Sequence, residues 1–75
     1  MAFTQLVAKV LGVPDSDVTD DLGPATHSSW TSIKHLELIV AIEENYNLSF
    51  SRPEIRSVRS VGTLKKSILN RGLTP

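Results

Sequence analysis

The side chains best suited to chemistry lie together in the stretch "HSSWTSIKH", residues 27 to 35. It contains both histidines of the chain, and Ser32 stands where a long helical pattern begins. Free amides and the helix dipole make a helix N-terminus favourable for a phosphate group. The sequence therefore points to a phosphate that approaches or becomes attached to Ser32. In the alternative interpretation, Ser32 is only a helix cap.

Other kinds of chemistry have little support. Ser32 and His35 could pair as nucleophile and base, but no third group or oxyanion hole is visible. The histidines lack the paired spacing of metal ligands, so no metal site is expected. The segment with four aspartates lacks the glycine and the terminal glutamate of a calcium-binding loop, so calcium binding is not expected. The aspartates are Asp15, Asp17, Asp20 and Asp21. We expect a protein that is not itself an enzyme, with His35 in a structural role.

The composition predicts one small domain over residues 1–75. The chain has 75 residues, no cysteine and 40% hydrophobic residues, so packing rather than disulfides must stabilise it. No apolar run approaches the roughly 20 residues needed to cross a membrane. The first residues also lack the pattern of an export signal. We expect a cytoplasmic monomer that does not bind membranes.

Charge is divided unevenly between the two parts of the sequence. Residues 1–50 carry two basic and seven acidic side chains (2 − 7 = −5), and residues 51–75 carry six basic and one acidic (6 − 1 = +5). The helices could attract each other across the fold, or each part could face a different partner. Nucleic-acid binding is not expected, because the net charge is zero and the long helix is acidic.

Apolar spacing predicts four helices and no strand. Phe3 opens a first helix that ends near Gly12, and a long polar connection runs over residues 13–30. A second helix is capped by Thr31 or Ser32 and runs to about Tyr46. A third of one to two turns begins with a capping box at 51–54, and a fourth runs from about residue 60 toward Gly72 with Val61, Leu64, Ile68 and Leu69 inward. The predicted fold is all-α, a small four-helix bundle with a long first loop and a short third helix.

A helical wheel of the second helix separates two sets of side chains. Its predicted core side spans roughly 140° to 300° from Ile33, at about 100° per residue, and holds Leu36, Leu38, Ile39, Ile42 and Tyr46. A border stripe combines apolar and acidic residues, namely Ile33, Glu37, Val40 and Glu44. Either Ile33 and Val40 complete the core, or the stripe is a docking surface whose carboxylates steer basic partners.

The run "TSIKHLELIVAIEENY", residues 31–46, resembles the signature of the acyl and peptidyl carrier proteins. In that family an Asp-Ser-Leu motif opens the second helix, and Val-Glu-Leu and apolar-Glu-Glu blocks follow at fixed distances. Ser32 matches the modified serine and Ile33 the leucine, while 36–38 and 42–44 match the later blocks without a gap. "SVGTLKKSI", residues 60–68, is similar to the start of the family's last helix, so the resemblance covers about residues 30–70.

The resemblance implies a small four-helix fold that carries acyl or aminoacyl intermediates as thioesters. The cofactor would be 4′-phosphopantetheine, moved from coenzyme A to Ser32 by a magnesium-dependent phosphopantetheinyl transferase. The arm would supply the thiol that this cysteine-free chain lacks. Other partners would be acyl- or aminoacyl-loading and acyl-transfer enzymes. Five positions match residues that dock such partners: Ile33, Glu37, Val40, Glu43 and Glu44.

Two residues in front of the serine depart from the family pattern. Thr31 stands where the family usually has aspartate, so a carboxylate that commonly meets the transferase is missing. Trp30 resembles stand-alone carriers of specialised, secondary-metabolite-type pathways, and the basic C-terminal third argues against a role in fatty-acid synthesis. The alternative function is that of an unmodified helical adaptor that binds other proteins.

Overall fold

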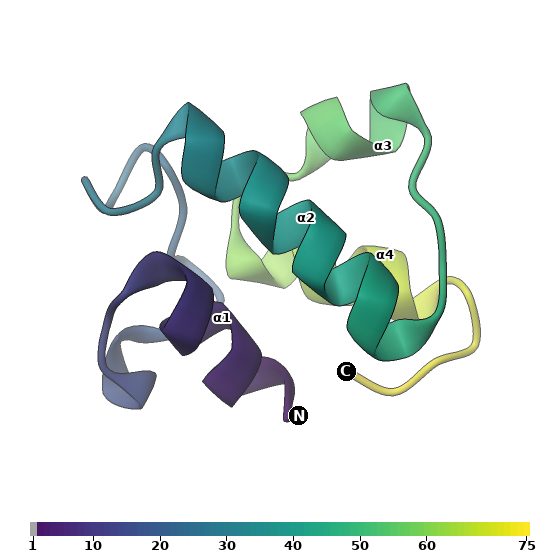
Figure 1. The fold of residues 1–75 in the computed structure, drawn as a ribbon, viewed down its shortest axis with the longest axis horizontal. Helices are drawn as coiled ribbons and strands as arrows, with labels where there is room; N and C mark the ends of the chain where they lie inside the picture. Colours follow the sequence, from purple (N-terminus) through teal and green to yellow (C-terminus); the bar gives the residue numbers. More distant parts are fainter. Residues whose placement is uncertain (1) are drawn as a thin grey trace.

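The computed structural model describes residues 2–75, which form four α-helices around a common core (Figure 1). They are α1 (Phe3–Leu11), α2 (Ser32–Tyr46), α3 (Arg52–Ser57) and α4 (Val61–Leu69). No strand occurs in this part of the chain. The predicted all-α fold with a long first loop and a short third helix is confirmed. A 3-10 turn at Asp15–Asp17 within the loop was not predicted.

The helices begin and end where local sequence signals place them. Gly12, with φ 71°, ends α1, and Asn47, with φ 54°, ends α2. Ser51 and Glu54 form the predicted capping box of α3. The cap of α2 is Thr31, whose hydroxyl oxygen accepts a hydrogen bond from a first-turn amide. None of the helices in residues 2–75 has the length and apolar character needed to span a membrane.

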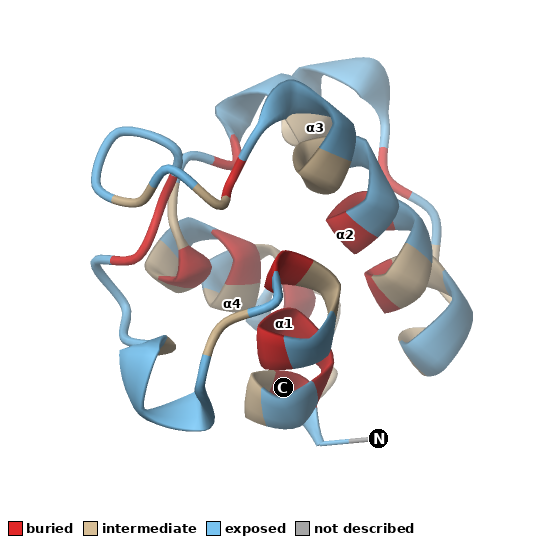
Figure 2. Ribbon diagram, turned by 60° about the vertical axis from the view of Figure 1, so that its left-hand side comes forward, coloured by how far each residue is buried: buried red, intermediate tan, exposed pale blue. Residues whose placement is uncertain are grey.

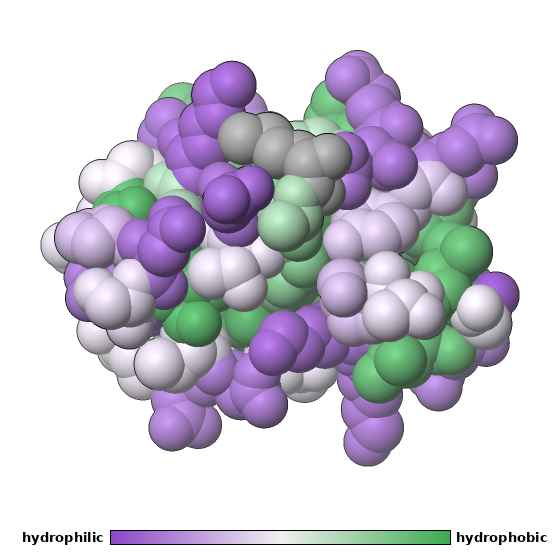
Figure 3. Space-filling model, turned by 90° about the horizontal axis from the view of Figure 1, so that it is seen from below, coloured by the Kyte–Doolittle hydropathy of each residue, from purple (hydrophilic) through white to green (hydrophobic). Residues whose placement is uncertain are grey.

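The core draws on α1, α2, α4 and the connections between them. Figure 2 shows buried segments of these helices facing the interior, whereas α3 contributes no fully buried residue. Viewed from below, hydrophilic side chains cover much of the surface, and hydrophobic ones show between them and along the right-hand side (Figure 3). The buried apolar cluster is Phe3, Leu6, Val7, Leu11, Leu22, Trp30, Leu38, Ile39, Ile42, Phe50, Val58, Val61, Leu64 and Ile68.

Two predicted core residues are exposed instead. Leu36 is 57% exposed and Leu69 is 55% exposed. On the wheel, Leu36 lies roughly 60° beyond Ile39, at the outer edge of the apolar arc. Leu69 is the last residue of α4, where the chain turns away toward Gly72. The buried stripe of α2 is therefore narrower than its apolar pattern predicts.

Backbone hydrogen bonds fasten the long first loop to the beginning of α4. The amide of Val61 donates to the carbonyl of Leu22 at 2.8 Å, and the amide of Gly62 donates to the carbonyl of Asp20 at 3.0 Å. First-turn amides have no acceptor within their own helix, so the loop satisfies two of them. Asp20 also forms an ion pair of 2.9 Å with Lys65. The loop is thus a fixed part of the fold, with buried Leu22 as its apolar anchor.

Arg71 holds the short α3 in place. Its guanidinium forms an ion pair of 2.6 Å with Glu54 and donates to the carbonyl of Ser49 at 2.9 Å. It also lies over the ring of Phe50, 4.7 Å from its centre. Hydrogen bonds from the Ser51 amide and from Arg71 lower the pKa of Glu54. The single acidic residue of positions 51–75 is therefore engaged within its own part of the fold.

A substitution at Gly23 tests how closely the first loop packs against the residues before α4. A side-chain carbon at this buried position would overlap the carbonyl of Arg59, so we expect Gly23→Ala to lower the free energy of unfolding by about 2 kcal/mol. Gly62→Ala is the matched control. Its added carbon would lie 3.2 Å from the carbonyl of Asp20, and the helix propensity of alanine offsets that tight contact. Urea denaturation compares the two, and equal stabilities would contradict the close loop packing.

Candidate functional site

Ser32 is the first residue of α2, and its side chain is exposed. The capping bond comes from Thr31, whose hydroxyl oxygen accepts from the Lys34 amide at 3.2 Å. The interpretation of Ser32 as only a helix cap is therefore wrong, because its neighbour fills that role. The amides of Ser32 and Ile33 open the helix and have no intrahelical acceptor. A phosphate on the Ser32 hydroxyl would lie next to this positive end of the helix.

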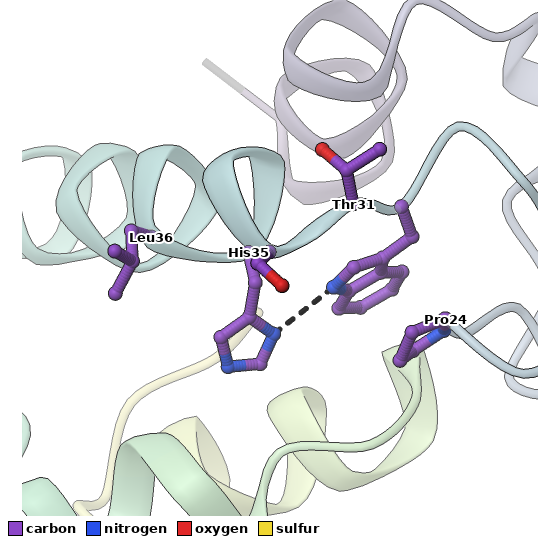
Figure 4. A pocket seen from close by; sticks show the side chains of 6 residues that line it. Pro24, Thr31, His35 and Leu36 are labelled. Atoms are coloured by element: carbon purple, nitrogen blue, oxygen red, sulfur yellow. Dashed lines mark hydrogen bonds between the residues drawn. The ribbon is translucent and has the colours of Figure 1, made fainter.

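A chain of two hydrogen bonds links the end of the first loop, α2 and α3. The indole nitrogen of Trp30 donates to Nδ1 of His35 at 3.0 Å (Figure 4). Nε2 of His35 lies 2.9 Å from the carbonyl oxygen of Ile55. Since Nδ1 accepts from the indole, Nε2 carries the proton and donates to that carbonyl. The carbonyl belongs to the last turn of α3, where no helical amide can reach it.

These bonds settle two predictions about His35. The histidine is structural, as expected from its position on the wheel, and its ring is partly buried. Both of its nitrogens already have partners, so it does not serve Ser32 as a base in this arrangement. Trp30, only 3% exposed, is a core residue as well as the donor to His35.

An open, mainly apolar pocket of about 500 Å³ lies beside Ser32. In Figure 4, His35 and Leu36 point from α2 to the same side, and Pro24 of the first loop lies beyond the indole ring that donates to His35. The sequence did not single out Pro24, because only the folded loop brings it close to α2. The pocket is lined by Pro24, Trp30, Thr31, Ser32, His35 and Leu36.

A second open groove, of about 450 Å³, runs along α2. Ile33 is 71% exposed and Val40 is 50% exposed, so the interpretation that they complete the core is wrong. Glu37 and Glu44 are exposed beside them, and Lys34 forms a surface ion pair of 3.3 Å with Glu37. We call this groove the α2 strip, and its lining residues are Ile33, Leu36, Glu37, Val40, Ala41 and Glu44.

Glu43, which the family resemblance placed among the docking residues, lies apart from the α2 strip. Its carboxylate is partly buried and accepts a hydrogen bond of 2.9 Å from the Phe50 amide. It therefore holds the connection between α2 and α3. The sequence did not identify Leu36 as a surface residue of the site, although it lines both the pocket and the strip. Its position at the edge of the apolar arc on the helical wheel was the sequence feature that could have indicated its exposure.

Residues 2–75 contain no group of three or more histidine, cysteine, aspartate or glutamate side chains that could hold a metal ion. The one histidine–carboxylate pair in that range joins His27 and Asp17 at 3.8 Å. Comparison of the chain with models of known protein families and with curated proteins gives no match. The local geometry around Ser32 must therefore carry any functional argument.

The Trp30–His35 pair supplies a stability prediction. His35→Ala removes both hydrogen bonds and leaves the indole and the Ile55 carbonyl without these partners. We expect a loss of about 2 to 3 kcal/mol in unfolding free energy, with a red shift in the fluorescence of the single tryptophan. His35→Gln keeps a donor and an acceptor, so it should restore part of the stability.

His27→Ala is the matched control, because the polar partners of that ring among the described residues are Asp17 and Ser29 of the loop. Urea unfolding monitored by fluorescence measures all three variants. An unchanged stability and emission maximum in His35→Ala would contradict the hydrogen-bonded chain.

Proposed function

We propose that this protein is a carrier of the acyl and peptidyl carrier type, with a 4′-phosphopantetheine arm on Ser32. The observation that carries the proposal is the exposed Ser32, which begins α2 and lines an apolar pocket that shares Leu36 with the α2 strip. The pattern of residues 31–46 supports the same conclusion. The role is one of attachment and presentation rather than catalysis.

The residues present are compatible with such an arm. In the loading step, the Ser32 oxygen forms a bond to the phosphorus next to the pantetheine of coenzyme A. The pyrophosphate bond breaks, the adenine-containing half leaves, and the hydroxyl proton passes to the transferase. The phosphodiester would then face the first amides of α2, and the adjoining pocket offers apolar surface to the arm. When bound, the arm supplies the thiol for thioesters, which this chain lacks.

Thr31 replaces the aspartate that a transferase commonly meets in this family. Its hydroxyl caps α2, so the helix begins correctly without a carboxylate. The missing charge then affects recognition by the transferase rather than the fold. This favours a dedicated transferase and a specialised pathway over general fatty-acid synthesis.

The α2 strip is proposed to dock the transferase and the loading and acyl-transfer enzymes. Its apolar side chains supply contact area, and Glu37 and Glu44 attract basic surfaces. The arm raises the effective concentration of the carried group at each docked enzyme. The protein would act as a cytoplasmic monomer, since transfer to successive partners requires a free strip.

Intact-mass analysis tests the attachment. The parent, incubated with coenzyme A and a broad-specificity phosphopantetheinyl transferase, should gain the mass of one arm. Ser32→Ala should gain none, because it lacks the hydroxyl, while the control Ser29→Ala should gain one. If the parent stays unmodified even with its cognate transferase, the carrier function is wrong and the unmodified adaptor is favoured.

Substitutions in the strip test docking. Glu37→Lys or Val40→Asp should slow transfer to a partner enzyme about tenfold, because each removes a contact or reverses a charge. Both positions are exposed, so stability should change by only about 0.5 kcal/mol. Asn70→Asp, at the exposed end of α4, adds the same charge as Val40→Asp outside the strip and should transfer normally. Unfolding of the strip variants, seen by circular dichroism, would contradict the expectation that these exposed positions serve docking rather than stability.

A further inference from the structure

The opposite charges of the two parts of the chain mostly do not neutralise each other within the fold. A single ion pair between described residues, Lys65 with Asp20, joins residues 51–75 to the acidic part. Arg71 pairs with Glu54 of its own part. The other four basic side chains of positions 51–75 are exposed and form no ion pair with a described carboxylate. They are Arg52, Arg56, Arg59 and Lys66.

Three of these arginines form a basic stripe on and after α3, defined here as Arg52, Arg56 and Arg59. Arg52 and Arg56 are four residues apart on the helix, so their side chains lie on one face. Glu54 does not neutralise them, because its carboxylate is held by Arg71 and the Ser51 amide. The stripe is therefore an unpaired positive surface within the described fold.

The α3 part of the basic stripe lies near the first turns of α2. Arg56 follows Ile55, whose carbonyl accepts the hydrogen bond from His35, one turn after Ser32. At about 100° per residue, Ser32 falls between His35, which faces α3, and the residues of the α2 strip. Positive charge on α3 and the carboxylates of the strip therefore flank Ser32 on different sides.

We propose that the basic stripe binds an acidic surface of a partner protein while that protein engages the α2 strip. This rests on the carrier function proposed for Ser32. A uniformly basic partner would be repelled by the arginines, so the stripe would select among enzymes that reach the strip. A nucleic acid or an anionic membrane fits less well, because Glu37, Glu44 and the loop aspartates would repel it. A protein surface carries charges of both signs and fits both regions.

Binding of poly-L-glutamate, followed by amide chemical shifts, tests the stripe. Shift changes should centre on residues 52–59, and the affinity should fall as salt is added. The double variant Arg52→Glu with Arg56→Glu should bind about tenfold more weakly. Lys9→Glu with Lys66→Glu makes the same change in net charge at exposed sites outside the stripe, and should retain most of the affinity.

Equal losses in both double variants, or shift changes spread over the whole chain, would overturn the proposal. Tighter binding to duplex DNA than to polyglutamate would overturn it in favour of a nucleic-acid surface. Circular dichroism checks the fold, and Arg52→Gln with Arg56→Gln repeats the test if charge reversal unfolds the protein.

Loading of Ser32 in the same samples separates this proposal from the carrier function. If the parent gains no arm, the carrier function fails, and the partner proposal built on it is withdrawn even where the stripe binds polyglutamate. If the parent gains the arm and both double variants bind polyglutamate equally, only the basic stripe fails.

Discussion

The hydrogen-bonded chain from Trp30 through His35 to Ile55 sets the relation between α2 and α3. Trp30 is the last residue of the long loop and is buried, so its indole nitrogen needs a hydrogen-bond acceptor inside the protein. His35 supplies that acceptor through Nδ1, and its Nε2 donates to the Ile55 carbonyl of α3. A helix of six residues such as α3 is too short to be stable alone. The turn that follows Trp30 then carries Ser32 outward. These internal hydrogen bonds thereby hold the first turns of α2, where Ser32 is exposed.

The other supports of the fold work around this contact. Arg71 and Glu43 bind adjacent residues of the connection between α2 and α3, namely Ser49 and Phe50. The loop carbonyls fasten the start of α4. In a small chain without cysteine, such polar contacts supplement a core of modest size. They leave the outer sector of α2 uncovered between α1 and α3. The α2 strip is the consequence, since no other element of residues 2–75 shields its apolar residues.

The sequence predicted the elements well because their limits depend on local chemistry. Gly12 and Asn47 end helices through left-handed backbone conformations, and Ser51 begins one through a capping box. The exposure of Leu36 and the bond of Glu43 to the Phe50 amide depend on how the other elements pack on α2, which periodicity within α2 does not encode. The backbone bonds between the loop and α4 join residues about 40 positions apart in sequence, and no local pattern specifies such pairing. The candidate serine was found from the sequence, whereas its pocket required the fold.

The central claim is that Ser32 tethers the carried group, and the protein isolated from the cells that produce it tests this most directly. Fragment-ion mass spectrometry of that native protein locates any attached group to a single side chain. The account predicts a 4′-phosphopantetheine arm on Ser32, with part of the population bearing an acyl or aminoacyl thioester. A native protein that is wholly unmodified, or modified at Ser28, Ser29 or Thr31 instead, would contradict it.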